Sequence, residues 1–168
     1  MIRPVGEDDF VAIASITNHY ITTTSIHFAY DPVTPEDLMA TWRAHELHPW
    51  FVASDRQGVV GYAKAGVWRE RKAYSWTAEV GVYISPHACK RGLGSGLYDA
   101  LLDELPQRGF RSAVAGITLP NDASIALHKK HGFERVGVFA DAGWKLGAWH
   151  AVEWWQKRFA TGPEGPPA

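Results

Sequence analysis

The segment "HACKRGLGSGLY", residues 87–98, contains three glycines together with Lys90 and Arg91, and a helical pattern follows them. Upstream, "YSWTAEVGVYI" at 74–84 has the composition of a strand that stops at Ser85-Pro86. Downstream, leucines at 97, 101 and 105 form one apolar stripe of a helix. A strand, a glycine-rich turn and a helix N-terminus in this order predict a site for an anion on backbone N–H groups.

Two common nucleotide motifs do not fit this turn. A P-loop ends in Gly-Lys-Ser/Thr, which "CKRGLGSG" lacks, and a dinucleotide fingerprint needs a third glycine where this chain has Leu97. The general reading remains: glycines let a pyrophosphate approach the backbone closely, and Lys90 and Arg91 add charge-assisted contacts. The alternative is a solvated turn between a strand and a helix.

The rest of the chain predicts a mixed α/β, or α+β, single domain over residues 1–160. The tail "TGPEGPPA", 161–168, has too little apolar side chain to stay ordered. Thr34 is the expected N-cap of a helix that reaches Leu47, and Asn121 or Asp122 is the expected cap of the helix at 121–132. The other expected strands are 2–5, 50–54, 59–69, 112–119, 133–140 and 147–159, and the other helices are 10–21, 94–109 and 121–132.

Composition limits the class of partner. The formal net charge of −1 disfavours nucleic acid and anionic membranes as partners. The single cysteine, Cys89, excludes an intrachain disulfide framework. The first residues lack the pattern of a signal peptide, and no apolar run is long enough to span a bilayer. We therefore expect a cytoplasmic protein.

Two segments in register resemble the GCN5-related N-acetyltransferase (GNAT) family. "CKRGLGSGLYDALL" resembles its acetyl-CoA loop, with Gly92 and Gly94 on the two loop glycines, and "NDASIALHKKHGF" resembles a later segment beside the thioester. Cys89 stands where the family has Gln or Arg, and His128 where many members have tyrosine. The resemblance implies a GNAT fold, a central mostly antiparallel sheet flanked by helices, with acetyl-CoA as co-substrate.

Four further stretches resemble one branch, the phosphinothricin and methionine sulfoximine acetyltransferases, in which histidine at the position of His128 is usual. They are "HYITTTSIHF", "RKAYSWTAEVGVYISP", "GITLPNDASIALH" and "AGWKLGAWHAVEWWQ". The branch implies transfer of acetyl to the α-amine of a small amino-acid-like acceptor such as phosphinothricin, methionine sulfoximine or methionine sulfone. It also implies a homodimer joined through the tryptophan-rich C-terminal end.

Glu79 and His128 are the expected catalytic residues. Glu79 interrupts an otherwise uncharged strand and coincides with the glutamate that the branch uses as base; partial burial would raise its pKa. The alternative is a solvated glutamate, or one paired with Arg69, Arg71 or Lys72. His128 could relay the amine proton or protonate the CoA thiolate, whereas a lone helix histidine is more often structural.

The resemblance also implies binding residues. The amide of Gly81 or Val82 is the expected oxyanion donor. The acceptor would contact Phe28, Arg71 and Tyr74, with the arginine fork on its anionic end. The other residues expected to bind acetyl-CoA are Ile84, Lys90, Arg91, Gly92, Leu93, Gly94, Ser95, Gly96, Asn121 and Lys130.

Three other interpretations were weighed. The pairs His45/His48 and His128/His131 have helix-face spacing for a metal, but no cysteine or carboxylate completes either site, so no metal is expected. Another amine, such as a polyamine, an aminoglycoside or a protein N-terminus, could be the acceptor. A non-catalytic acyl-CoA-binding sensor is the alternative outside enzymes.

Overall fold

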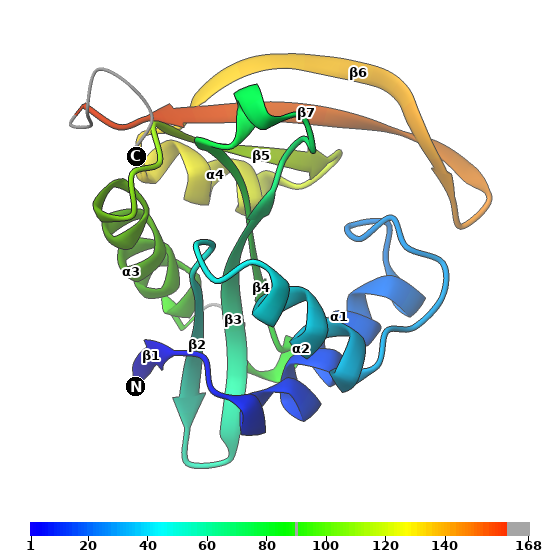
Figure 1. Cartoon of the computed structure of the whole chain (residues 1–168). Coiled ribbons are helices and arrows are strands. Elements are labelled where there is room, and N and C mark those ends of the chain that lie inside the picture. The colour runs from blue at the N-terminus through cyan, green and yellow to red at the C-terminus, as the bar shows by residue number, and fades with distance from the viewer. Residues whose placement is uncertain (90, 161–168) are drawn as a thin grey trace.

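The computed structural model of the chain describes residues 1–89 and 91–160 (Figure 1). Lys90 and the tail predicted at 161–168 lie outside the described residues. The elements in chain order are β1 (Ile2–Pro4), η1 (Glu7–Asp9), α1 (Phe10–Thr23), α2 (Pro35–Ala44), β2 (Trp50–Asp55), β3 (Gly58–Val67), η2 (Lys72–Tyr74), β4 (Thr77–Ile84), η3 (Pro86–Ala88), α3 (Leu93–Gln107), β5 (Ser112–Thr118), α4 (Asp122–Lys130), β6 (Glu134–Lys145) and β7 (Ala148–Arg158).

The described strands form one sheet in the order β1-β2-β3-β4-β5-β7-β6. Every neighbouring pair is antiparallel except β4 and β5, which run parallel. A parallel pair needs a crossover connection, and α3 supplies it. The mostly antiparallel sheet predicted for this chain is therefore confirmed, and its one parallel pair lies at the centre.

Helices cover the two faces of the sheet (Figure 1). Side chains alternate along β3: Ala63 and Ala65 belong to a core with the leucines of α3, while Tyr62 packs with α1 and α2. β4 alternates likewise, because Val80 belongs to the α3 core and Tyr83 packs against the α1 and α2 core. The sheet thus has an α3 and α4 face and an α1 and α2 face.

The predicted caps are found where the sequence placed them. Thr34 accepts a hydrogen bond from the amide of Asp37 at 3.1 Å, and the Asp37 carboxylate accepts one from the amide of Thr34. Of the two cap residues possible for α4, Asn121 is the one used, because its Oδ1 accepts from the amide of Ser124 at 3.2 Å.

Three predicted boundaries are wrong by three residues or more, and one of them is the end of β6, expected at Ala140 and found at Lys145. The helix expected to reach Leu47 ends at Ala44. His45 Nδ1 lies 2.9 Å from the Thr41 carbonyl, the acceptor that a continued helix would offer to the His45 amide. The strand expected from Tyr74 begins at Thr77, because residues 72–74 form the short helix η2.

Candidate active site

The centre of the sheet is split. β4 and β5 pair at three positions, and the last of these joins Glu79 to Val114. Both strands continue past this point, β4 to Ile84 and β5 to Thr118, with a cavity of about 330 Å³ between them. Separated strands leave backbone N–H and C=O groups facing the gap, where a ligand can take the place of the missing neighbour.

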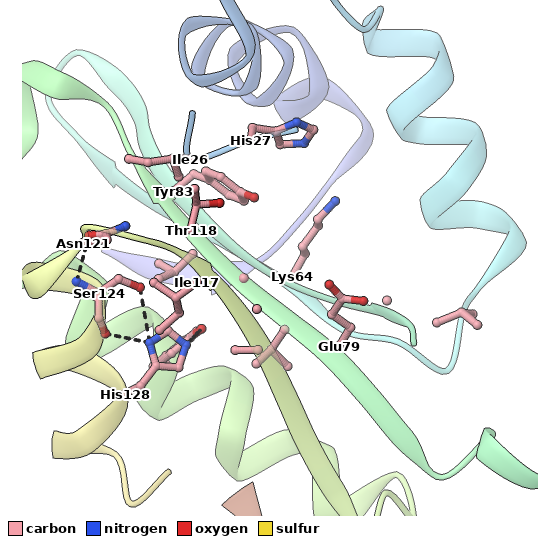
Figure 2. A pocket seen from close by; sticks show the side chains of 18 residues that line it. Ile26, His27, Lys64, Glu79, Tyr83, Ile117, Thr118, Asn121, Ser124 and His128 are labelled. Carbon is pink, nitrogen blue, oxygen red and sulfur yellow. Dashed lines mark hydrogen bonds between the residues drawn. The ribbon is translucent and has the colours of Figure 1, made fainter. Parts of the chain in front are cut away.

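Glu79 and His128 lie on opposite faces of this split. Ala78 and Val80 point into the α3 core, so Glu79 points to the α1 and α2 face. His128 is on α4, where it packs against Tyr98 of α3. Both residues line the same cavity, and Figure 2 shows them on either side of it. A molecule in the gap can therefore be reached from both faces.

The Glu79 carboxylate is half-buried and carries no ion pair among the described residues. Burial raises its pKa above the ordinary value of 4.5, while the positive charges of Lys64 and Arg69 act in the opposite direction. The rise that the sequence predicts from partial burial is found. A carboxylate of raised pKa in a cavity suits a general base.

His128 is buried, with 3% of its surface exposed, and both ring nitrogens have partners. Nδ1 lies 2.7 Å from the carbonyl of Ser124, and Nε2 lies 2.8 Å from the hydroxyl of Tyr98. A carbonyl only accepts, so Nδ1 carries the proton and Nε2 accepts from Tyr98. Burial lowers the pKa of His128, which keeps this neutral form.

A second cavity, of about 380 Å³, adjoins the first on the α1 and α2 face. Phe28 lines it, as expected, together with Val152 and Trp154 of β7. The two cavities share a wall that contains Glu79 and Tyr83. The second cavity is therefore a chamber with both apolar and polar lining residues that opens onto the carboxylate.

The glycines of the turn have separate roles. Gly92 is the N-cap of α3 with φ of 74°, a conformation that strains any other residue. A side chain at Gly94 would meet Leu127 of α4 at 3.5 Å, and one at Gly96 would meet the tip of Ile2. The amides of the first turn of α3 have no partner within the helix, and they are the groups on which the sequence predicts an anion site.

Two basic side chains near this turn, Arg91 and Lys130, are engaged with the protein. Arg91 forms an ion pair with Asp55 at 2.9 Å, so its guanidinium is directed toward the β2 and β3 hairpin. Lys130 donates to Ser95 Oγ at 2.7 Å and joins α4 to the first turn of α3. Leu93, the first residue of α3, packs against the core.

The structure brings three of the six remaining predicted residues to the cavities. Gly81, Val82 and Asn121 line the first cavity. Ile84, Arg71 and Tyr74 line neither cavity: Ile84 packs against the α3 core, Arg71 is exposed, and Tyr74 packs edge-on against Trp68 at 5.2 Å.

Sequence reasoning missed several polar residues of the first cavity, among them Lys64, His27 and Tyr83. Lys64 had a usable signal, because it interrupts the apolar strand "VVGYAKAGV" just as Glu79 interrupts the next one. His27 and Tyr83 carry no such signal. Burial lowers the pKa of His27 to about 4 and raises that of Tyr83 to about 12.

A split sheet with the first-turn amides of α3 at one end and the half-buried carboxylate of Glu79 at the other leaves space for an extended ligand beside a second molecule. The chain matches the acetyltransferase (GNAT) family over residues 13–133. It is 43% identical to a phosphinothricin N-acetyltransferase of Streptomyces viridochromogenes, over 94% of this chain and 87% of the relative.

Two further comparisons agree. An L-methionine sulfoximine/L-methionine sulfone acetyltransferase of Pseudomonas paraeruginosa is 36% identical over 88% of each chain. The crystal structure of a phosphinothricin acetyltransferase of Sinorhizobium meliloti with acetyl-CoA superimposes with a TM-score of 0.91 at 29% identity, covering 100% of this chain and 92% of that one. The chain belongs to the GNAT family. The predicted family, fold class and enzyme class, an acetyl-CoA-dependent N-acetyltransferase, are confirmed.

Proposed function

We propose that this protein transfers the acetyl group of acetyl-CoA to the α-amine of a small amino-acid-like acceptor of the phosphinothricin, methionine sulfoximine or methionine sulfone type. The observation that carries the proposal is the split between β4 and β5, with Glu79 facing a small chamber on one face. The names of the relatives support the donor and the class of acceptor.

The donor is expected to follow β4. Its pyrophosphate would sit on the first-turn amides of α3, whose N-cap is Gly92. The pantetheine arm would run back along β4 from Ile84 to Glu79, about 16 Å of strand at ~3.3 Å per residue. The amide of Gly81 or Val82 would then polarise the thioester carbonyl, because both residues line the gap.

Glu79 is the base in this proposal. An amine in the chamber loses a proton to the Glu79 carboxylate, directly or through water, and its lone pair attacks the thioester carbon. The tetrahedral intermediate collapses as the C–S bond breaks, which leaves the N-acetyl product and the CoA thiolate. The second proton of the attacking nitrogen passes, directly or through water, to the thiolate, and Glu79 returns its own proton to solvent.

The hydrogen bonds of His128 support a positioning role. In the neutral ring Nδ1–H is donated to Ser124 and Nε2 accepts from Tyr98, so neither nitrogen holds a proton for the leaving thiolate. The ring ties α4 to α3 beside the gap. The catalytic role expected from the sequence stays a prediction.

The location and assembly of the protein remain proposals. Within residues 1–89 and 91–160, no helix is both long and apolar enough to cross a bilayer. We keep the cytoplasm as the expected compartment. The homodimer is supported by exposed aromatic side chains on β6 and β7, among them Phe139, Trp144 and Trp149, which are 64%, 50% and 59% exposed. Sedimentation at twice the mass of the chain would establish it.

The experiment that tests the function is CoA release from acetyl-CoA with a panel of amines. A thiol reagent also reacts with the exposed Cys89, so a blank without acceptor is needed. Turnover with the sulfone, the sulfoximine and phosphinothricin supports the proposal. Turnover confined to a polyamine or an aminoglycoside would replace the acceptor, and binding of acetyl-CoA without any turnover would favour the sensor.

A further inference from the structure

Lys64 is a lysine in the middle of the sheet, beside the proposed base. In the register of β2, β3 and β4 it lies between Trp50 on one side and Gly81 on the other. Its neighbours along β3, Ala63 and Ala65, point into the α3 core, so Lys64 points to the same face as Glu79. Lys64 and Glu79 are diagonal neighbours, because Glu79 pairs with Gly66.

The Lys64 ammonium has no hydrogen bond or ion pair to any described residue. Its Nζ lies 5.2 Å from the centroid of the Trp50 ring, and the side chain lines the first cavity. Figure 2 shows it extending from the sheet toward the loop that carries His27. Burial lowers the pKa of Lys64, and Glu79 acts against this. A desolvated cation without a hydrogen-bonding anion raises the free energy of the folded protein, so an anionic group of a ligand would bind favourably at this position.

Other cations nearby are unsuited to this task. Among the described residues that line the two cavities, Lys64 is the only lysine or arginine. Lys145 is occupied, since its Nζ donates to the carbonyls of Ile21 and His27. Arg69 lies over the ring of Trp68, and Arg71 is exposed outside both cavities.

We propose that Lys64 binds the carboxylate of the acceptor and thereby places the α-amine at Glu79. This inference rests on the proposed function and names the residue that reads the anionic end, a role that the sequence suggested for Arg71. An α-amino acid carries its ammonium and its carboxylate on the same carbon. Diagonal residues on neighbouring strands have Cβ atoms about 7–8 Å apart, and two long side chains at that spacing can hold such a pair between them.

The pairing of charges also decides between acceptor classes. The ammonium of an amino acid meets Glu79 and its carboxylate meets Lys64, so each buried charge of the protein gains a partner. A polyamine or an aminoglycoside brings a further cation toward Lys64 and no anion. The site therefore selects zwitterionic acceptors by attraction at one end and repulsion at the other.

The test uses two acceptors that differ only in the anionic group, methionine sulfone and its α-carboxamide. We expect Lys64→Met to lower kcat/KM for the sulfone by about ten- to a hundredfold, mostly through KM, and that for the carboxamide by less than about threefold. Ratios of variant to wild type cancel the difference in amine basicity between the two acceptors. Lys64→Arg should recover part of the loss, and the KM of acetyl-CoA should stay near that of the wild type.

Lys129→Met is the matched control, because Lys129 is also a lysine over a tryptophan ring, at 5.7 Å from the Trp155 centroid, but lines neither cavity. It should leave both acceptors unchanged. Equal losses for the two acceptors in Lys64→Met would overturn the inference, since Lys64 would then act on Glu79 or on folding. If neither Lys64→Met nor Lys64→Gln folds, the wild type decides: less than tenfold preference for the sulfone over the carboxamide overturns it.

Failure of the proposed function gives a different result. A wild type that binds acetyl-CoA but acetylates neither acceptor refutes the function itself. A wild type that acetylates methionine sulfone, with Lys64→Met equally active on it, leaves the function standing and refutes only the role of Lys64.

Discussion

Replacement of Glu79 by glutamine removes the proposed base and keeps the size of the side chain. The carboxylate is half-buried on the wall shared by both cavities, and burial holds its pKa above 4.5. Removal of a general base typically costs 10²- to 10⁴-fold. We expect kcat to fall by about a hundredfold or more, equivalent to about 2.7 kcal/mol of transition-state stabilisation. Affinity for acetyl-CoA should be near that of the wild type.

The pH profile separates a base from a structural residue. In the wild type, kcat/KM should fall as the pH drops through the raised pKa of Glu79, because the protonated carboxyl cannot accept a proton. Glu79→Gln should lose this acid limb and gain activity as rising pH deprotonates the acceptor itself. CoA release from pH 5 to 10 measures both, and calorimetry measures acetyl-CoA affinity.

Glu134→Gln is the matched control, because Glu134 is an exposed glutamate at the start of β6 that lines neither cavity. It should behave as the wild type. The reasoning fails if Glu79→Gln turns over at the wild-type rate, or if it is slow yet keeps the same acid limb. The first result removes Glu79 from the mechanism, and the second assigns the limb to another group.

Three further predictions concern the turn, the acceptor loop and pH stability. Gly92→Ala should lower the free energy of unfolding by about 1 kcal/mol and weaken acetyl-CoA binding, because φ at Gly92 is 74°. The control Gly137→Ala should have neither effect. Equal denaturation midpoints for the two variants would contradict this prediction. Lys145→Met removes the hydrogen bonds from Lys145 to the carbonyls of Ile21 and His27, which hold the loop of His27 in place. The KM of the acceptor should therefore rise about three- to tenfold, while the KM of acetyl-CoA should not change. An equal rise in both KM values would refute the local effect. The pKa of His27 is lowered from 6.5 to about 4 by burial, so the unfolded chain takes up this proton first and stability should fall as pH drops through that window; thermal unfolding of His27→Asn should show a smaller fall, and parallel curves would contradict the assignment.

Local signals in the sequence were sufficient for much of the fold. The apolar stripe of α3, the Thr34 cap and the alternating strands each depend on residues close together in the chain, so they could be predicted. The end of α2 could not be predicted in this way, because it depends on a hydrogen bond between the ring of His45 and the carbonyl of Thr41. Such competition between a side chain and the backbone leaves no periodic signal.

The candidate site was predictable where motif and strand pattern coincide. Glu79 could be selected as a charge in an apolar strand, and Gly92 as a glycine before a helix. In the structure Glu79 lies at the last paired position of β4 and β5, and Gly92 is the N-cap of α3. Arg71 and Tyr74 were assigned to the acceptor by resemblance, but neither lines a cavity, and Tyr74 packs against the nearby Trp68.

The opposite faces of Glu79 and His128 could not be derived from the sequence. They depend on how β4, β5 and α4 are placed together, and the strands separate only beyond Glu79. Lys64 could have been found, because it satisfies the same criterion that selected Glu79.

Acetyl transfer to a small zwitterionic amine can be measured as CoA release at saturating acetyl-CoA with methionine sulfone, methionine sulfoximine, phosphinothricin, spermidine and an aminoglycoside, each against a blank without acceptor. We expect turnover with the first three and none above the blank with the last two. Turnover with spermidine or the aminoglycoside at a rate equal to or above that with methionine sulfone would contradict this expectation, as would bound acetyl-CoA with no turnover on any amine.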